Sequence, residues 1–259
     1  MPRPRPSLLE WERWGKADPM YGVATVRGRE FDGPQPWTVD DFYRMGEDEV
    51  RTFLDMWQQY LGKAPSGDLA EIGCGAGRLT RSLAARFEQV FATDISTGML
   101  EAAREHMPSN VVLRKGDGLT LPFESRSVDA GFSYIVFQHF DGRAMIEQYV
   151  KELARVLRPG GTVMLHVPAV EPVQRFRQIV GLFGLRRRIT QFLTSRGSFP
   201  SPRQRFFVTM NYRMYNVSKI QAILKRNGFT RLRTIQMPGS DRRGTFHFGR
   251  FEVPVGSMS

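Results

Sequence analysis

Short apolar runs and segments of helical periodicity alternate through the middle of the chain. The expected strands are DLAEIG, QVFATD, NVVLRKGD, SVDAGFSYIVF and GTVMLHV, in that order. Between them, RLTRSLAARF, TGMLEAAREHM and residues 141–157 repeat apolar positions at spacings of three and four residues, which predicts helices. Strands that alternate with helices in this way are typical of βαβ units. The pattern therefore predicts an α/β fold: a Rossmann-like, mostly parallel, seven-stranded sheet with helices on both faces.

The chain on either side of this core has a different pattern. The first 37 residues mix Pro, Trp and Gly without a clear period, so we expect an irregular N-terminal arm. Thr38 and Asp41 then have the spacing of a helix start, and apolar residues continue at helical spacing as far as Leu61. Near the C-terminus, NVSKIQAILKRNG predicts a helix capped by Asn216 and ended by Gly228. FTRLRTIQM and GTFHFGRFEV predict two final strands, the last of them antiparallel.

Composition places the chain among globular proteins. It has 259 residues, of which 41% are hydrophobic and 12% aromatic, enough for one well-filled domain with appendages. The single cysteine, Cys74, excludes an intrachain disulfide and leaves no cysteine-rich metal site. We expect no metal cluster, although carboxylates such as Asp141 leave open a Mg²⁺ ion beside a diol. The N-terminus lacks the apolar run of a signal peptide, and no stretch reaches the roughly 18 apolar residues of a membrane span. These features favour a cytoplasmic protein.

The formal net charge of +11 is unevenly distributed along the chain. Residues 1–170 contain 20 Lys and Arg against 23 Asp and Glu, whereas residues 171–259 contain 17 against 3. The two parts therefore carry net charges of −3 and +14. A strongly basic part fits an anionic partner, although a preference for Arg also follows from genome composition.

The sequence EIGCGAG, from Glu71 to Gly77, lies between an expected strand and an expected helix. Glycines at such a turn permit positive φ angles and let backbone N–H groups approach a ligand at a helix N-terminus. The next strand ends in Asp94, whose carboxylate can accept hydrogen bonds from both hydroxyls of a ribose. Asp117 follows the third strand, again at the end where open α/β sheets bind ligands. The GxGxxG spacing of nicotinamide-binding proteins is not met, and no lysine of the P-loop type follows the glycines.

These motifs occur in the order and at the spacing of a known family. EIGCGAG is followed by TDISTGML, then by GDGLTLPFESRSVD, then by a helix that ends in ARVLRPGGTVMLHV. The segment from Leu69 to Val167 resembles the class I S-adenosylmethionine-dependent methyltransferases, in particular the ubiquinone-biosynthesis subgroup. The resemblance covers about 100 residues and is specific for fold and cofactor rather than for the acceptor. It implies a methyltransferase that uses S-adenosyl-L-methionine.

The resemblance also assigns the residues that bind the cofactor. Gly73, Gly75 and their neighbours are expected to hold the methionine part, and Asp94 the ribose. Asp117 and the two residues after it are expected to face the adenine, and Ser133 to line the methionine side. The full expected set is Glu71, Gly73, Cys74, Gly75, Asp94, Ile95, Asp117, Gly118, Leu119 and Ser133.

The segment after the fourth strand borders the methyl group in this family. It lacks the Asn/Asp-Pro-Pro-aromatic sequence of amino methyltransferases that act on nucleobases, and the paired glutamates of protein arginine methyltransferases are absent too. His139 stands there instead, and an imidazole can take a proton from a hydroxyl near neutral pH. Two roles stay open for His139: a catalytic base, or a structural residue beside the following helix. His166, at the end of the fifth strand, is the second candidate base.

Residues 171–215 interrupt the alternation at the position where methyltransferases of this type carry a lid over the acceptor pocket. One helical face of this segment is apolar and consists of Phe176, Ile179, Val180 and Phe183. Its nine arginines are Arg175, Arg177, Arg186, Arg187, Arg188, Arg196, Arg203, Arg205 and Arg213, against one acidic residue, Glu171. Three interpretations stay open: a solvated lid, a surface that binds an anionic acceptor, and peripheral membrane contact through residues 171–193.

On this basis the chain divides into residues 1–62, an arm and helix that cover the pocket, and residues 63–259, the methyltransferase domain with 171–215 as an inserted lid. We expect a small-molecule acceptor, with O-methylation of a sugar or secondary-metabolite hydroxyl as the first hypothesis. A lipid or isoprenoid acceptor at a membrane surface is the second. RNA is the third, because the basic C-terminal part leaves a nucleic-acid partner open. A degenerate fold that binds the cofactor without turnover is disfavoured by the intact motifs.

Overall fold

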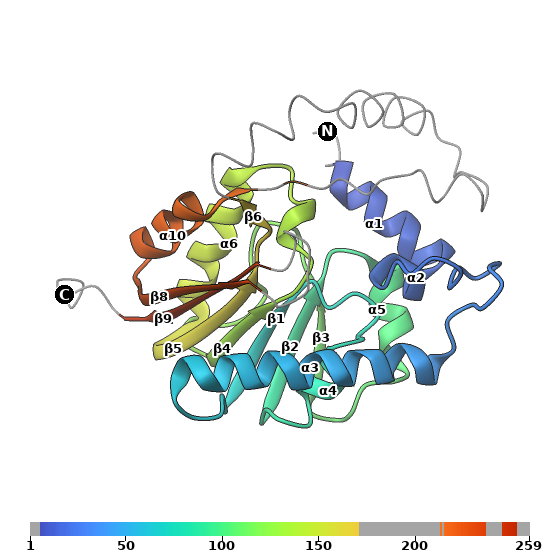
Figure 1. Ribbon diagram of the computed structural model, residues 1–259, viewed down its shortest axis with the longest axis horizontal. Coiled ribbons are helices and arrows are strands. Elements are labelled where there is room, and N and C mark those ends of the chain that lie inside the picture. Colours follow the sequence, from blue (N-terminus) through green and yellow to red (C-terminus); the bar gives the residue numbers. More distant parts are fainter. Residues whose placement is uncertain (1–5, 171–212, 214, 237–244, 253–259) are drawn as a thin grey trace.

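A seven-stranded sheet forms the centre of the computed structural model, which describes residues 6–170, 213, 215–236 and 245–252 (Figure 1). The strand order is β3-β2-β1-β4-β5-β9-β8. The strands are β1 (Asp68–Ile72), β2 (Gln89–Asp94), β3 (Val111–Lys115), β4 (Val128–Ser133), β5 (Leu157–His166), β8 (Phe229–Gln236) and β9 (Thr245–Phe251). A second sheet joins β6 (Ala169–Val170) and β7 (Tyr215–Asn216) in parallel.

The order of the strands reverses at the centre of the sheet. β1 pairs in parallel with β2 and with β4, whereas β9 runs antiparallel to both of its neighbours, β5 and β8. The chain begins the sheet at β1, moves outward to β3 and then crosses back to β4. Such a reversal is the point where open α/β sheets bind ligands, outside the carboxyl ends of the strands. The expected fold class is confirmed, including the antiparallel last strand.

Two groups of helices cover the two faces of the sheet. They are α3 (Val39–Leu61), α4 (Thr80–Leu83) and α5 (Thr97–Arg104) on one face, and α6 (Arg143–Val156) and α10 (Val217–Arg226) on the other. Phe53 and Trp57 of α3 are at most 1% exposed and pack in one core cluster with Phe132 of β4. Leu153 of α6 and Ile220 of α10 belong to the core cluster on the opposite face. Figure 1 shows α3 and α6 on opposite sides of the strands.

The N-terminal arm is more regular than the sequence pattern predicts. α1 (Pro6–Ala17) and α2 (Pro19–Val23) are helices, so the expectation of an irregular arm is wrong for this part. The start of α2 carries a recognisable signal, because Asp18 Oδ1 accepts a hydrogen bond from the N–H of Tyr21 at 3.2 Å and a proline occupies the first helical position. The burial of Trp14 against Tyr21 and α5 stabilises α1. Contacts between distant segments, rather than local periodicity, account for this helix.

Helix boundaries agree with the sequence where a capping residue marks them. Thr38 Oγ1 accepts the N–H of Asp41 at 3.1 Å at the start of α3, and Asn216 caps α10 in the same way. Gly62 ends α3 with a φ of 75°. α4 is only 4 residues long, shorter than predicted, because the chain after it continues as hydrogen-bonded turns that bring Phe87 into the core.

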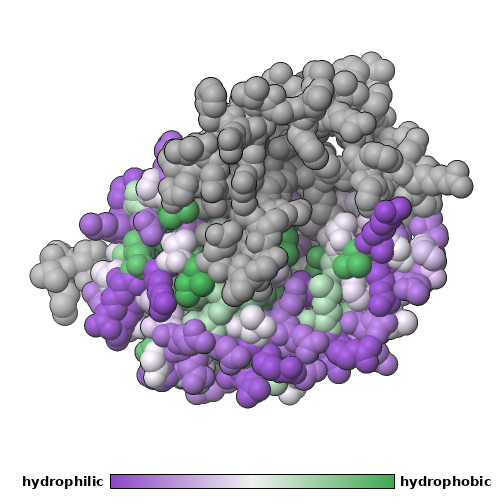
Figure 2. Space-filling model, viewed as in Figure 1, coloured by the Kyte–Doolittle hydropathy of each residue, from purple (hydrophilic) through white to green (hydrophobic). Residues whose placement is uncertain are grey.

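The outer surface of α3 is hydrophilic, as Figure 2 shows along the edge where this helix lies. Asp40, Arg44 and Glu47 are among its exposed residues, as expected for an amphipathic surface helix. Across the described part of the chain, no helix is both long enough and apolar enough to cross a bilayer. Apart from residues 213 and 215, the segment expected to form a lid lies outside the described residues.

Candidate active site

The turn between β1 and α4 is built from glycines in the left-handed region. Gly73, Gly75 and Gly77 have φ angles of 73°, 55° and 78°. The N–H of Gly73 donates to the carbonyl of Thr93 on β2, at 2.7 Å. A side chain at Gly75 would place its Cβ only 2.5 Å from Val23 Cγ2, at the end of α2. The turn therefore requires glycine for both its backbone conformation and its close contact with the arm.

Asp94 ends β2 with its carboxylate directed to the glycine turn. Its Oδ2 accepts the N–H of Gly75 at 2.9 Å, and its Oδ1 accepts the N–H of Ser96 at 2.8 Å. Burial raises the pKa of Asp94 to about 6, while these backbone hydrogen bonds oppose the rise. A carboxylate has about four acceptor positions, so each oxygen keeps capacity for a further hydroxyl donor. This geometry fits the two hydroxyls of a ribose.

Glu71 lies beneath the same turn and is 2% exposed. Burial raises its pKa to about 7, with a smaller opposing effect from the Thr80 hydroxyl and a further increase from the negative charge of Asp94. Its Oε2 is buried without a hydrogen-bond partner. A buried carboxylate of this kind favours a cation nearby, as the ammonium group of a bound amino acid would supply.

The third expected acidic residue has a different role in the fold. Asp117 is exposed, and its Oδ1 accepts the N–H groups of Leu119 and Thr120, each at 2.7 Å. Burial acts to raise its pKa, but these hydrogen bonds hold the pKa below the ordinary value. The carboxylate thus shapes the loop after β3, while Leu119, at 42% exposure, offers an apolar surface. Ile95 lies beside this loop, with its Cγ2 3.9 Å from the position of a Cβ at Gly116.

Two residues of the expected set are buried inside the strand ends. Ser133 donates its hydroxyl to the carbonyl of Ile72 at 3.0 Å and so joins the ends of β4 and β1. Cys74 is 4% exposed, and burial raises the pKa of its thiol well above the ordinary value. Neither side chain presents a reactive group to solvent.

The arm contacts α5 and the end of β3 through α1. The sequence predicted that the arm covers the pocket, but not which residues make the contact. Gly15 of α1 and Gly98 of α5 touch, since a Cβ on Gly98 would lie 2.7 Å from the carbonyl carbon of Gly15. Glu12 accepts the N–H of Thr97 at 3.1 Å and lies 3.2 Å from Lys115 Nζ. In the sequence, the close contact between α1 and α5 is marked only by two glycines far apart in the chain. A single sequence does not show that these glycines meet.

The two candidate bases lie at the carboxyl ends of β4 and β5. His139, in the short 3₁₀ helix η1 (Phe137–His139), is 5% exposed and its Nε2 lies 3.1 Å from Gln138 Nε2. Its ring meets the ring of Trp11 edge-on at 4.9 Å, so α1 borders this side as well. His166 is 3% exposed, and its Nδ1 accepts the N–H of Ile135 at 3.3 Å. The structure thus brings both histidines near the turn that follows β4.

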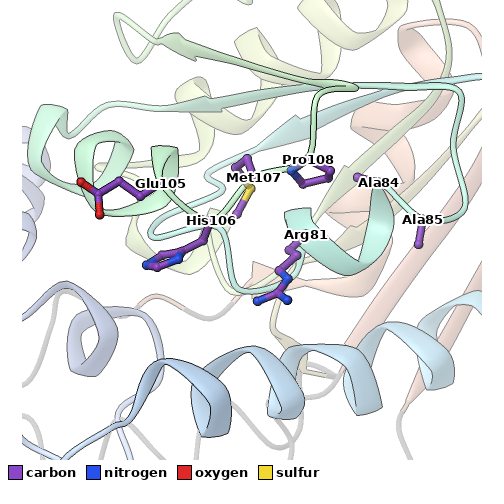
Figure 3. A pocket seen from close by; sticks show the side chains of 7 residues that line it. All are labelled: Arg81, Ala84, Ala85, Glu105, His106, Met107 and Pro108. Atoms are coloured by element: carbon purple, nitrogen blue, oxygen red, sulfur yellow. The ribbon is translucent and has the colours of Figure 1, made fainter.

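A cavity of about 530 Å³ opens on the outside of the molecule, beside α4 and the end of α5. It is lined by Arg81, Ala84, Ala85, Glu105, His106, Met107 and Pro108 (Figure 3). The side chains of Arg81 and His106 point toward α3, where both contact the ring of Tyr43. None of the ten expected cofactor-binding residues lines this cavity. Within the described residues, no group of three or more His, Cys, Asp or Glu side chains could hold a metal ion.

Residues 70–165 match the family described as "Methyltransferase domain", and residues 25–114 match "tRNA (Uracil-5-)-methyltransferase". Over 93 residues the chain is 45% identical to the biotin biosynthesis bifunctional protein BioHC of Cellvibrio japonicus, covering 36% of this chain and 18% of that protein. Over 152 residues it is 31% identical to a malonyl-[acyl-carrier protein] O-methyltransferase of Methylococcus capsulatus, covering 54% of each. The matches thus span at most about half the length of these curated relatives.

Among solved structures, N-methyltransferase NodS from Bradyrhizobium japonicum, in complex with S-adenosyl-L-homocysteine, has the same fold. The TM-score is 0.57 at 17% identity, over 96% of this chain and 100% of that one. Residues 70–165 thus match a methyltransferase domain, and the fold of the chain is that of this methyltransferase structure. The S-adenosyl-L-homocysteine bound in that structure agrees with the expected cofactor. The ubiquinone-biosynthesis subgroup stays a prediction.

Proposed function

We propose that this protein transfers a methyl group from S-adenosyl-L-methionine to a hydroxyl of a small molecule. The observation that carries the proposal is the carboxylate of Asp94, held between the N–H groups of Gly75 and Ser96 at the open end of the parallel sheet. A ribose binds through hydroxyls, and this carboxylate is oriented to accept from two of them. The cofactor supplies the methyl group, activated on its sulfonium.

Different residues of the chain bind different parts of this cofactor. Asp94 binds the ribose, and the buried Glu71 lies where it attracts the ammonium group of the methionine part. Ile95 and Leu119 give apolar surface to the adenine at the ends of β2 and β3. Val23, which contacts the glycine turn, closes the site from the arm. These interactions position the methyl group, which is the main catalytic contribution a protein makes to such a transfer.

On the acceptor side, the proposed proton acceptor is His139. It lies on the turn after β4, buried beside the ring of Trp11. A neutral imidazole in such a place can take the proton that an acceptor hydroxyl loses during transfer. O-methylation agrees with the name of the malonyl-[acyl-carrier protein] O-methyltransferase to which the chain is similar. A sugar or secondary-metabolite hydroxyl is the acceptor class we propose.

The proposed division of the chain follows from the same contacts. Residues 1–62 cover the site, because α1 contacts both α5 and His139 and α2 ends on the glycine turn. Residues 63–259 are the methyltransferase domain, with residues 171–215 as a lid that contacts the acceptor. The protein acts in the cytoplasm on this proposal. The lid arginines bind an anionic acceptor or a membrane surface, or remain solvated, as set out above.

RNA is a second candidate acceptor, supported by the match of residues 25–114 to the tRNA (uracil-5-)-methyltransferase family and by the net charge of +14 in residues 171–259. The buried Cys74 weighs against one form of this chemistry. Its thiol has a raised pKa and is the only thiol in the chain, so no thiolate is available for covalent addition to a uracil ring. A hydroxyl of a small acceptor is therefore the favoured target.

Calorimetry with S-adenosylhomocysteine tests the cofactor site directly. The wild-type protein is expected to bind with a dissociation constant in the micromolar range, about −8 kcal/mol. Asp94→Asn should weaken binding by about tenfold or more, because a charged acceptor of ribose hydroxyls is lost. Asp68→Asn is the matched control, since Asp68 starts β1 at the opposite end of the sheet and pairs with Arg158. Equal affinity in all three proteins would reject the assigned site.

A further inference from the structure

The turn that follows β4 contains a strained residue. Ile135 has a φ of 58°, in the left-handed region that side chains branched at Cβ avoid. Among the described non-glycine residues, the others with positive φ are Arg126 and Arg231, which are not branched at Cβ. Holding a residue in such a conformation is energetically unfavourable and requires compensating interactions around it.

One compensating interaction comes from the next strand. The N–H of Ile135 donates to Nδ1 of His166 at 3.3 Å. The imidazole itself is held in place by the rings of Tyr134, at 5.1 Å, and Phe246, at 5.3 Å, and the whole residue is 3% exposed. Because Nδ1 accepts this hydrogen bond, the ring carries its proton on Nε2. An imidazole used in this way does not take a proton at Nδ1.

The conformation of Ile135 decides where the next residues lie. Val136 packs on the glycine turn so closely that a Cβ on Gly73 would collide with Val136 Cγ2. The carbonyl of Val136 then accepts the N–H of His139 at 2.9 Å, which starts η1. The left-handed residue thus directs the chain toward the cofactor side at Val136 and toward the acceptor side at His139.

We infer that His166 is a positioning residue for the cofactor site, an inference that rests on the proposed function. Its Nδ1 holds Ile135 in the left-handed conformation, and this conformation keeps Val136 against Gly73. His166 therefore acts through the backbone of the turn, and the role of second candidate base does not apply to it. The methionine part of the cofactor is the ligand whose binding depends on this turn.

Two substitutions at His166 separate its acceptor atom from its volume. His166→Phe keeps a ring of similar size but removes the acceptor, whereas His166→Asn places an amide oxygen near the position of Nδ1. Calorimetry on the full chain is expected to show about tenfold weaker binding of S-adenosylhomocysteine for His166→Phe, which is the loss of one hydrogen bond. The affinity of His166→Asn should remain within about threefold of wild type, because its amide oxygen can accept the same hydrogen bond. Thermal unfolding of each variant gives its stability separately.

Rescue at Ile135 provides the second test. Glycine adopts positive φ without strain, so Ile135→Gly should restore most of the affinity lost in His166→Phe. Ile135→Ala is the matched control, because alanine also truncates the side chain but keeps most of the backbone strain. No recovery is expected from Ile135→Ala in the His166→Phe background.

The outcomes distinguish this inference from the proposed function. If wild type fails to bind S-adenosylhomocysteine, both are overturned. If wild type binds but His166→Phe and His166→Asn lose affinity equally, or glycine and alanine at position 135 rescue equally, the inference alone is overturned. If His166→Phe does not fold, ¹⁵N NMR of the wild-type protein can test the inference instead. It shows which nitrogen of the His166 imidazole carries the proton, and His166→Asn assigns the signal. A proton on Nε2 supports the inference, and a proton on Nδ1 rejects it.

Discussion

The carboxylate of Glu12, on α1, accepts a hydrogen bond from the N–H of Thr97, the first residue of α5, at 3.1 Å. The first N–H groups of a helix have no partner within the helix, so this contact acts as a cap supplied by a different helix. Lys115, at the end of β3, lies 3.2 Å from the same carboxylate oxygen. Burial acts to raise the pKa of Glu12, but the hydrogen bond from Thr97 and the charge of Lys115 lower it overall. The arm is thus tied to the helix that follows Asp94.

Removing this charge should loosen the arm. Glu12→Gln is expected to lower the free energy of unfolding by about 0.3–1 kcal/mol, the range for a negative charge at a helix N-terminus. The arm should also be cut faster in limited proteolysis, because α1 is less firmly docked on α5. Arg13→Gln, on the exposed side of the same helix, is the control. Indistinguishable cleavage rates in the two variants would show that Glu12 does not hold the arm.

Because α1 and α5 are in close contact at Gly15, replacing this glycine by alanine should have the opposite effect on stability from the one that helix propensity predicts. Alanine in place of a helical glycine ordinarily stabilises a helix by up to about 1 kcal/mol. Gly15→Ala should instead destabilise the protein by about 1–3 kcal/mol, because the new Cβ would lie 2.7 Å from the backbone nitrogen of Met99. Gly142→Ala, where a Cβ meets nothing within 4 Å, should be close to neutral. A stabilising effect of Gly15→Ala in thermal unfolding would contradict the close helix contact.

Glu71 predicts a pH dependence of stability whose sign follows from its raised pKa. The carboxyl has a pKa of about 7 in the fold, against an ordinary value of 4.5, so the folded state binds its proton more tightly than the unfolded state does. The free energy of unfolding therefore falls as pH rises from 4.5 to 7, and the loss is complete above 7. Glu71→Gln should lack this contribution to the pH dependence. Its free energy of unfolding relative to that of wild type should therefore be higher at pH 8 than at pH 5, by on the order of 3 kcal/mol.

Chemical denaturation of both proteins at pH 5 and pH 8, without cofactor, measures this difference. Parallel behaviour of wild type and Glu71→Gln at the two pH values would show that Glu71 is not protonated in the fold. In the presence of S-adenosylhomocysteine the variant should bind more weakly, since the uncharged amide attracts an ammonium group less strongly.

If His139 is the catalytic base, its substitution should lower turnover without changing the affinity for the cofactor. With an acceptor identified, His139→Ala should lose about 10²–10⁴-fold in kcat, because a general base contributes in this range. The dissociation constant of S-adenosylhomocysteine should stay within about twofold. His106→Ala, in the outer cavity, is the control and should keep its turnover. Near wild-type kcat for His139→Ala, with chemistry rate-limiting, would assign His139 a structural role beside Trp11 and Gln138.

The sequence was sufficient to predict the elements that are determined by residues close together in the chain. The βα alternation predicted the sheet, and caps such as Thr38 and Asn216 predicted where helices begin. The glycine turn and Asp94 were both assigned to one cofactor site, and they are joined by a hydrogen bond of 2.9 Å. Periodicity, capping and turn conformation act within a few residues, so one sequence displays them. The length of α4 and the helices of the arm were missed, because packing rather than local pattern decides them.

The role of a polar side chain at the site was decided by residues distant in sequence. Asp94 ends one strand and Asp117 follows another, yet Asp117 folds its own loop whereas Asp94 bonds to the glycine turn. His166 was a candidate base by its position in the sequence, and only the tertiary structure brings its Nδ1 to the strained Ile135. The sequence by itself determined the fold class, the glycine turn and the kinds of side chain at the strand ends. The tertiary structure decided which atoms those side chains meet, because hydrogen bonds and burial depend on the packing of the whole chain.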